Sequence, residues 1–207
     1  GPIELSIKDA PEGFILSGGM IPAGKNFIRM TLTAPSTSYD YPLTLSIEGT
    51  AFVNGEKIVR TAIPEENMMQ AFGPTHLVPS ENFLVMLLKQ NFRNIPVSLM
   101  SNQSLKIPAG QSAEVYVKIP PRMQSEEFIL ELKNPPDGIS LENTGIKNGL
   151  LTFTVKTDAD KVKTGFSDNL IVEVFTNSPV GPKDEQGNRT IQKISRGFLP
   201  AIPIEII

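Results

Sequence analysis

The 207-residue sequence contains no cysteine, no tryptophan and a single histidine. Without cysteine there is no disulfide scaffold, and one histidine cannot supply the Cys/His clusters of structural zinc sites. The formal net charge is −3, so the positive surplus typical of nucleic-acid binders is missing. No run of about 18 apolar residues occurs, as a membrane-spanning helix would need. We therefore expect no cofactor, no nucleic-acid partner and no membrane span in this stretch.

Glycine and proline are abundant instead, with 16 Gly and 18 Pro. Hydrophobic residues make up 40% of the chain, enough to build a core. Apolar and polar residues alternate over short segments, a pattern that places one set of side chains on a buried face and the other in water. These segments predict strands at Ile3–Ile7, Ile28–Thr33, Leu43–Ile47, Val115–Ile119, Phe128–Leu132, Leu151–Val155, Leu170–Phe175 and Ile202–Ile206.

Turn residues separate the predicted strands. Asn54-Gly55 and Asn148-Gly149 each stand between apolar segments, and this dipeptide predicts a type I′ hairpin because both residues tolerate a positive φ. One segment favours a helix: Pro64–Phe72 opens with proline and two glutamates and continues with good helix formers. We expect a helix of at most two turns near residues 64–72.

Two sequence echoes indicate internal repetition. Residues Ile7–Phe14 recur as Leu132–Ile139, 125 positions later. Ile21–Gly24 recurs as Ile107–Gly110, 86 positions later. Such echoes also arise when unrelated strands share similar turns, but the eight aligned positions favour a repeated module.

The predicted fold class is all-β, with two tandem Ig-like antiparallel β-sandwich domains. Frequent turn signals and many short strands in about 100 residues are typical of such sandwiches. The first domain is expected at residues 3–90 and the second at 95–207, with Asn91–Asn94 as a short junction. Gly1-Pro2 has the form of a tag-cleavage remnant and is left out of the first domain. Phenylalanines are the expected core anchors: Phe14, Phe52, Phe153 and Phe175.

Several stretches resemble a known family. They resemble Ig-like modules near the C-termini of large exported bacterial proteins, which often also carry pre-peptidase-type domains. The stretches are Pro11–Gly24, Ile63–Phe72, His76–Pro79, Lys161–Phe166, Asn169–Glu173 and Leu199–Pro203. The resemblance spans nearly the whole chain after Pro2. It implies an extracytoplasmic, non-catalytic module whose partners are the remaining domains of a longer polypeptide, and it brings no catalytic residues.

Three places could carry a ligand site. Tyr39 and Tyr41 lie in a polar loop and are the best candidates for contacting a glycan or a cell-surface protein, because tyrosine supplies contact area at low entropy cost. Asp158, Asp160 and Asp168 could hold calcium, although the neighbouring lysines Lys156, Lys161 and Lys163 favour a solvated loop. His76, the single histidine, lies between two prolines, where a structural or surface role is favoured over catalysis.

Two functions therefore remain open, and neither is enzymatic. The first is a structural or interaction module that spaces, presents or adheres on the outside of a bacterium. The second is an accessory domain, attached to an exported hydrolase, that binds a carbohydrate or a calcium-dependent ligand.

Overall fold

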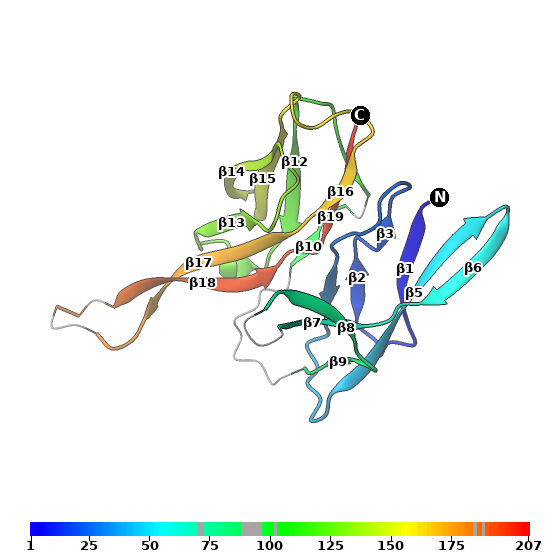
Figure 1. Cartoon of the computed structure of the whole chain (residues 1–207). Coiled ribbons are helices and arrows are strands. Elements are labelled where there is room, and N and C mark those ends of the chain that lie inside the picture. The colour runs from blue at the N-terminus through cyan, green and yellow to red at the C-terminus, as the bar shows by residue number, and fades with distance from the viewer. Residues whose placement is uncertain (70–72, 88–96, 102, 184–185, 188) are drawn as a thin grey trace. The chain divides into compact units, whose positions relative to one another are not determined.

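The computed structural model describes residues 1–69, 73–87, 97–101, 103–183, 186–187 and 189–207 (Figure 1). The chain is 55% strand and 2% helix, the latter being the 3₁₀ turn Pro121–Met123, so the prediction of an all-β fold is confirmed. Two compact units are present: residues 1–28 with 32–90, and residues 29–31 with 91–207. The predicted junction at 91–94 lies outside the described residues, and the predicted domain boundaries stay predictions.

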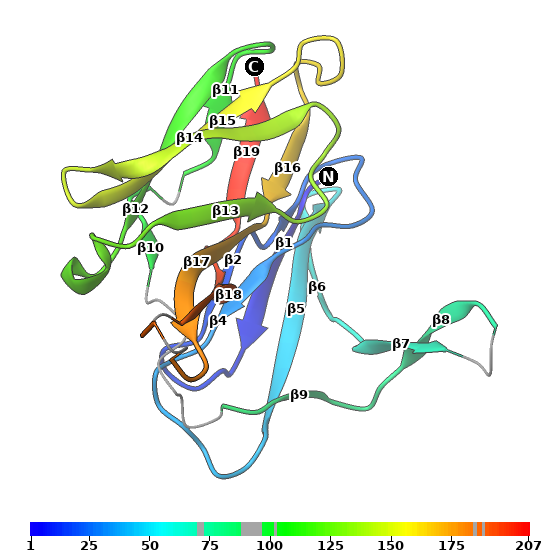
Figure 2. The ribbon, with the colours of Figure 1, turned by 90° about the vertical axis from the view of Figure 1, so that its left-hand side faces the viewer.

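The first unit is built on a sheet of order β3-β1-β5-β6, with β9 paired to the start of β5. β2 pairs β4, and β7 pairs β8 in a separate hairpin (Figure 2). β1 shows why the sequence forms this sheet: its alternate residues Ile3, Leu5 and Ile7 are half-buried while those between are exposed. The strands are β1 Ile3–Lys8, β2 Ile15–Ser17, β3 Met20–Ile21, β4 Thr31–Thr33, β5 Leu43–Val53, β6 Glu56–Thr61, β7 Glu65–Met69, β8 Thr75–Pro79 and β9 Phe83–Val85.

The second unit is a β-sandwich. One layer has the order β10-β12-β15-β14, and the other is made of the sheets β11-β19-β16 and β13-β17-β18. These two sheets follow each other along the chain, because only Ile171 separates β16 from β17. The strands are β10 Ser98–Leu99, β11 Leu105–Ile107, β12 Ser112–Lys118, β13 Phe128–Leu132, β14 Ile139–Lys147, β15 Leu150–Thr157, β16 Ser167–Leu170, β17 Val172–Val180, β18 Thr190–Phe198 and β19 Ile202–Ile206.

The core of the second unit lies between its two layers. β15 contributes Leu151, Phe153 and Val155, all fully buried, and the facing layer contributes Val172 and Ile204. Alternation therefore identified Phe153 correctly as a core anchor.

The other three proposed anchors differ. Phe14 is only half-buried. Phe52 is 67% exposed, because it lies one residue pair from the β5–β6 turn. The prediction that Phe52 lies in the core is therefore wrong. Phe175 is half-buried, since its neighbours Val174 and Thr176 take the inward positions on β17.

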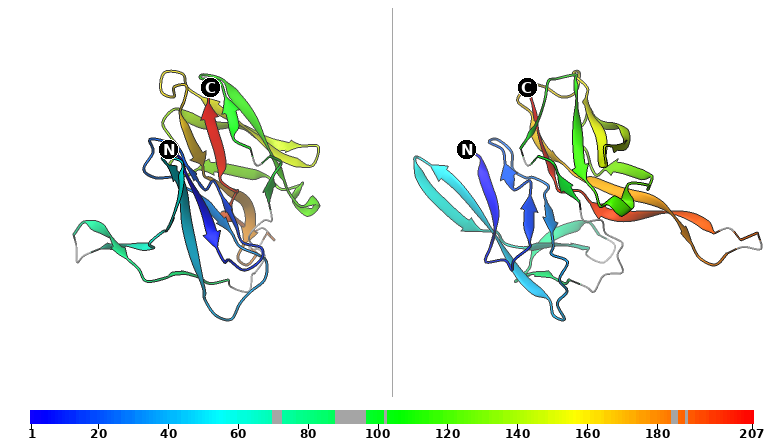
Figure 3. Two further views of the ribbon diagram at one scale, coloured as in Figure 1. Left: turned by 90° about the vertical axis from the view of Figure 1, so that its right-hand side faces the viewer. Right: turned by 180° about the vertical axis from the view of Figure 1, so that it is seen from behind.

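The predicted hairpin turns are present. Asn54 and Gly55 have φ of 52° and 85° and join β5 to β6, while Asn148 and Gly149 have φ of 51° and 76° and join β14 to β15. Positive φ at both central residues is what a type I′ turn requires. Figure 3 shows the β5–β6 ribbon that the first of these turns closes.

The sequence echoes correspond to equal turns. Phe14 N–H donates to Pro11 O and Ile139 N–H to Pro136 O, and the glycine of each turn, Gly13 or Gly138, has positive φ. The same holds for the other echo, where Lys25 N–H donates to Pro22 O and Gln111 N–H to Pro108 O. In both echoes, matching residues therefore produce matching backbone.

The expected helix near residues 64–72 is wrong. Glu65–Met69 forms strand β7, which pairs antiparallel with β8 from Glu65 opposite Pro79 to Met69 opposite Thr75. Ser80 N–H donates to Pro64 O at 2.8 Å and closes the base of this hairpin. A helix of two turns is marginal by itself, so cross-strand pairing decides the conformation. Residues 70–72 of the predicted helix lie outside the described residues.

Candidate functional site

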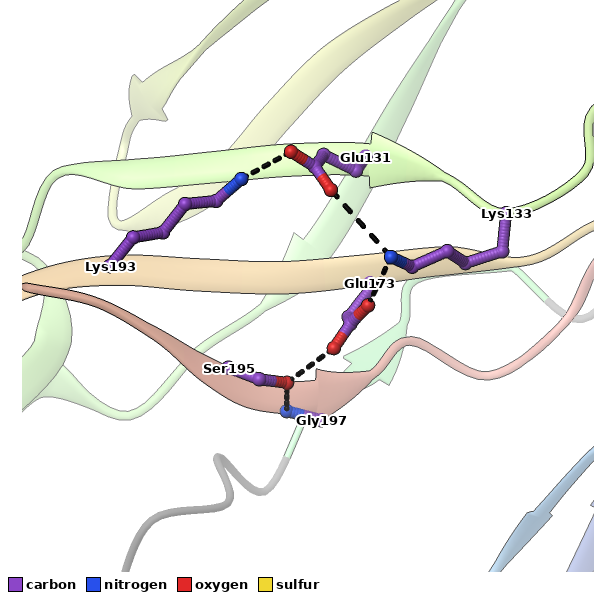
Figure 4. Close-up of polar contacts among 6 residues, drawn as sticks. All are labelled: Glu131, Lys133, Glu173, Lys193, Ser195 and Gly197. Carbon is purple, nitrogen blue, oxygen red and sulfur yellow. Dashed lines mark hydrogen bonds and ion pairs between the residues drawn. The ribbon is translucent and has the colours of Figure 1, made fainter.

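The densest polar arrangement lies on the outer side of the sheet β13-β17-β18 and consists of Glu131, Lys133, Glu173 and Lys193 (Figure 4). We call these four residues the Glu–Lys cluster. Lys133 Nζ lies 2.6 Å from Glu173 Oε2 and 3.6 Å from Glu131 Oε2. Lys193 Nζ donates to Glu131 Oε1, and Ser195 Oγ donates to Glu173 Oε1 at 2.6 Å.

Strand register explains why these side chains meet. Glu131 of β13 is directly opposite Glu173 of β17, so two carboxylates would face each other without lysine between them. Lys133 is held at the end of β13, where its N–H donates to Ile171 O at 2.8 Å. Lysines therefore separate and neutralise a pair of like charges.

The aromatic ring of Phe175 lies beneath the two lysines of the Glu–Lys cluster. Lys193 Nζ lies 4.1 Å and Lys133 Nζ 5.4 Å from the centroid of its ring. Both distances are within the range of cation–π attraction. The aromatic ring that alternation had assigned to the core instead supports two ammonium groups on the surface.

The contacts shift the pKa values of the cluster in the expected directions. The hydrogen bond from Lys193 lowers the pKa of Glu131, and the hydrogen bond to Glu173 raises the pKa of Lys133. Burial alone would raise the pKa of Glu173, but the hydrogen bonds from Lys133 and Ser195 outweigh it, and the net shift is downward. The ion pairs of the cluster therefore join side chains of β13, β17 and β18, the three strands of this sheet.

A second, smaller polar group lies on the opposite layer. Tyr116 Oη donates to Glu114, and Lys147 Nζ lies 3.0 Å from Glu114 Oε1. The hydrogen bond from Tyr116, followed by that from Lys147, lowers the pKa of Glu114, and the bond to Glu114 raises the pKa of Tyr116. This group connects β12 to β14 across β15.

Tyr39 and Tyr41, the predicted ligand-binding residues, lie against each other. Their ring centroids are 5.9 Å apart and the ring planes meet at 61°, an edge-to-face arrangement. Tyr41 is 60% exposed, whereas Tyr39 is half-buried and its N–H donates to Leu87 O at 3.3 Å. The pair offers one exposed ring and no flat double platform, and its role in binding stays a prediction.

The acidic residues proposed for calcium have local partners. Asp158 Oδ1 accepts from Asp160 N–H at 3.0 Å, and Asp168 Oδ1 accepts from Asn169 N–H at 2.8 Å. Across the described residues, no three His, Asp or Glu side chains gather in a group that could hold a metal ion. The structure thus does not bring Asp158, Asp160 and Asp168 together as one ligand set.

His76 lies on β8, exposed and opposite Met68 of β7. Every residue of β7 and of β8 is exposed, including Met69 at 72% and Leu77 at 63%. The two strands of this hairpin (Figure 2) therefore expose apolar side chains next to polar ones.

The chain matches no family model, no curated protein and no solved structure. In the part of the chain that the structure describes, no helix is long and apolar enough to cross a membrane.

The Glu–Lys cluster corresponds to no sequence motif, although the spacing of its residues carries a signal for it. Lys8 and Lys133 already align in the 125-residue echo, and Glu48 and Glu173 have the same offset. When the 125-residue alignment is extended from the echoed turns to β5 and β17, Lys8 aligns with Lys133 and Glu48 with Glu173. Lys8 Nζ indeed lies 2.9 Å from Glu48 Oε1.

Proposed function

We propose that this chain is a non-catalytic structural module of a larger exported bacterial protein, built from tandem Ig-like sandwiches, and that it acts as a spacer that bears tension. The resemblance to Ig-like modules of exported proteins supports the extracytoplasmic location. The remaining domains of that polypeptide would be its main partners.

The strand order supports the Ig-like part of the proposal. The layer β10-β12-β15-β14 has the order A-B-E-D of the four-stranded sheet of a constant-type Ig domain, when β10 and β11 together count as strand A and the strands that follow are lettered B to E. β13, β17 and β18 form the facing sheet in the positions of strands C, F and G. Strand order identifies an architecture that hosts many functions, so the spacer role needs its own observation.

The observation that supports the spacer role is the parallel pairing of β11 with β19. Leu105 is opposite Ile204 and Ile107 opposite Ile206. Two further bonds extend the pairing: Ile207 N–H donates to Ile107 O at 3.0 Å, and Ala109 N–H donates to Ile207 O at 3.2 Å. We call this pairing the β11–β19 clamp.

The direction of the strands determines how the clamp responds to force. Tension reaches β11 at its N-terminal end and β19 at its C-terminal end. Because the strands are parallel, these ends lie at opposite ends of the clamp, and the hydrogen bonds are loaded together in shear. An antiparallel terminal pair would open one bond at a time. The second unit is therefore arranged to resist extension.

Single-molecule pulling tests the proposal directly. The chain has no cysteine, so Ser104→Cys, directly before β11, and a cysteine added after Ile207 give two unique handles at the two ends of the β11–β19 clamp. Forced unfolding is governed by the unfolding rate, which a sheared clamp lowers. We expect each molecule to show one cooperative unfolding event of its second unit. The force of this event should lie clearly above the force that opens a β-hairpin. Gradual extension at low force would contradict the spacer role.

Ala109→Pro provides the matched variant. Ala109 follows Pro108 in a turn with Gly110 at positive φ, a place where proline is well accepted, yet the substitution removes the N–H that donates to Ile207. We expect a lower unfolding force with the turn intact. Ala23→Pro makes the same change in the equal turn of the first unit and serves as the control, because it leaves the clamp untouched.

A further inference from the structure

Two asparagines of the chain are followed by glycine, Asn54 and Asn148, and each stands at the first central position of a type I′ turn. An Asn-Gly pair is chemically reactive. The backbone nitrogen of the glycine attacks Cγ of the asparagine amide, because glycine has no Cβ to hinder the approach. The new N–Cγ bond closes a five-membered succinimide ring, and the amide nitrogen of the side chain leaves as ammonia.

Water then opens the succinimide ring in one of two ways. Attack at Cγ breaks the Cγ–N bond and leaves an ordinary aspartate. Attack at the backbone carbonyl breaks the original peptide C–N bond and leaves isoaspartate, in which the chain runs through Cβ and Cγ. Both products carry a carboxylate in place of the amide, and isoaspartate also adds one atom to the backbone. Water is the sole co-reactant of this chemistry.

The turn at Asn54 closes the β5–β6 ribbon (Figure 3) and is open to solvent. Asn54 and Gly55 are both exposed, as are Phe52 at 67% and Val53 at 49%. Apart from the chain neighbours of Gly55, no described residue has an atom within 4 Å of the place that a Cβ on Gly55 would take. Neighbouring side chains therefore do not hinder a local opening of this turn to the geometry of ring closure.

The turn at Asn148 is braced by a glutamine. Gln124 Nε2 donates to Gly149 O at 3.2 Å, and the same nitrogen would lie 2.8 Å from a Cβ added at Gly149. Gln124 is itself placed by the 3₁₀ turn Pro121–Met123, because its N–H donates to Pro121 O at 3.2 Å. Gly149 is half-buried. Ring closure at Asn148 has to break the contact with Gln124, so this turn opens less often.

We propose that Asn54 is a site of spontaneous covalent modification, where succinimide formation and hydrolysis convert the amide into a carboxylate, and that Gln124 protects Asn148 from the same reaction. The product alters the end of the ribbon. A type I′ turn fits a loop of two residues, so the additional backbone atom of isoaspartate disrupts the pairing of Val53 with Glu56. The new carboxylate also places a second negative charge near Glu56. Modification of Asn54 therefore loosens the β5–β6 ribbon at its turn.

Incubation of the folded chain at neutral pH, followed by peptide mass spectrometry, gives the rates at both asparagines, because replacing the amide by a carboxylate changes the peptide mass. We expect Asn54 to convert about three- to tenfold faster than Asn148, the factor that one neutral hydrogen bond contributes. In Gln124→Ala the rate at Asn148 should rise towards the rate at Asn54, which itself stays unchanged. Equal rates in the parent chain, a slower rate at Asn54, or a rate at Asn148 that is the same in Gln124→Ala would overturn the proposal.

Amide hydrogen exchange across residues 50–53 and 56–59 tests the effect on the ribbon. We expect the isoaspartate form, separated after incubation, to lose protection there several-fold. Freshly prepared Asn54→Asp is the matched control, since it has the same charge on an ordinary backbone and aspartate tolerates positive φ; it should retain protection. Asn54→Gly keeps the turn but has no side-chain amide, so incubation should leave it unchanged. An equal loss in incubated Asn54→Gly, or full protection in the isoaspartate form, would refute the proposed effect.

Discussion

Lys133 Nζ lies 2.6 Å from Glu173 Oε2 and joins the end of β13 to β17. The same relationship recurs 125 residues upstream, where Lys8 Nζ lies 2.9 Å from Glu48 Oε1 between β1 and β5. Each lysine follows directly on the apolar residue that begins the echoed turn, and each glutamate lies on the long central strand. The ion pair therefore recurs at the same offset of 125 residues as the Pro-x-Gly turns.

Acid titration of stability tests the Glu–Lys cluster. Glu131 and Glu173 have pKa values lowered from the ordinary 4.5, so each binds a proton less readily in the folded state than in the unfolded state. Their contribution to the free energy of unfolding is present above pH 4.5 and is lost as the pH falls through the folded pKa. In Glu173→Gln we expect a smaller loss of stability on acidification, measured by urea unfolding at a series of pH values. Glu12→Gln, at an exposed turn position, is the control, and an identical pH dependence in both variants would refute the role of Glu173.

Gly138 is predicted to be the least replaceable turn residue of the second unit. Its φ is +80°, and a Cβ added there would lie 2.6 Å from Lys161 Cβ and 2.9 Å from Val162 Cγ2. Gly165, with φ of +87° in open space, has the backbone constraint alone. We expect Gly165→Ala to cost about 1 kcal/mol and Gly138→Ala at least about 2 kcal/mol, because overpacking adds to the strain. Far-UV circular dichroism during urea unfolding gives both values, and equal costs would show that the neighbours of Gly138 move aside freely.

Local chemistry determined which parts of the fold were predictable. Asn-Gly turns and the Pro-x-Gly echoes depend on a few adjacent residues, and they form as expected at Gly55 and Gly149. The conformation of Glu65–Met69 depends instead on a partner strand ten residues away, which a local helix signal does not report. Pairing between distant segments overrode local propensity at this place.

The candidate sites show the same division. The contact between Tyr39 and Tyr41 follows from their closeness in sequence. The Glu–Lys cluster requires the register of three strands, and the register places Glu131 opposite Glu173. Alternation places Phe175 on one face of β17 but does not say which face of the strand packs in the core. The cation–π contact between the Phe175 ring and Lys193 Nζ is therefore seen only in the structure.

Two phenylalanines that looked alike in the sequence should respond differently to truncation. Phe153 is fully buried in β15, whereas Phe52 is 67% exposed near the β5–β6 turn. We expect Phe153→Ala to cost about 3–5 kcal/mol and Phe52→Ala to stay within about 0.5 kcal/mol. If Phe153→Ala does not fold, Phe153→Leu gives a smaller loss in the same urea experiment. A large cost at Phe52 would mean that this side chain is covered in solution.

Calcium provides the test of the alternative function as an accessory ligand-binding domain. Asp158 Oδ1 and Asp168 Oδ1 each accept a backbone N–H, and the two residues do not form one ligand group with Asp160. Calcium prefers six to eight oxygen ligands, so a site here would need several oxygens to converge. A cation that binds only the folded state would raise the melting temperature. Because the three aspartates do not form one ligand group, we expect millimolar calcium to leave the melting temperature unchanged. A rise that disappears in Asp158→Asn, while Asp9→Asn in the first unit retains it, would favour the ligand-binding function over the spacer.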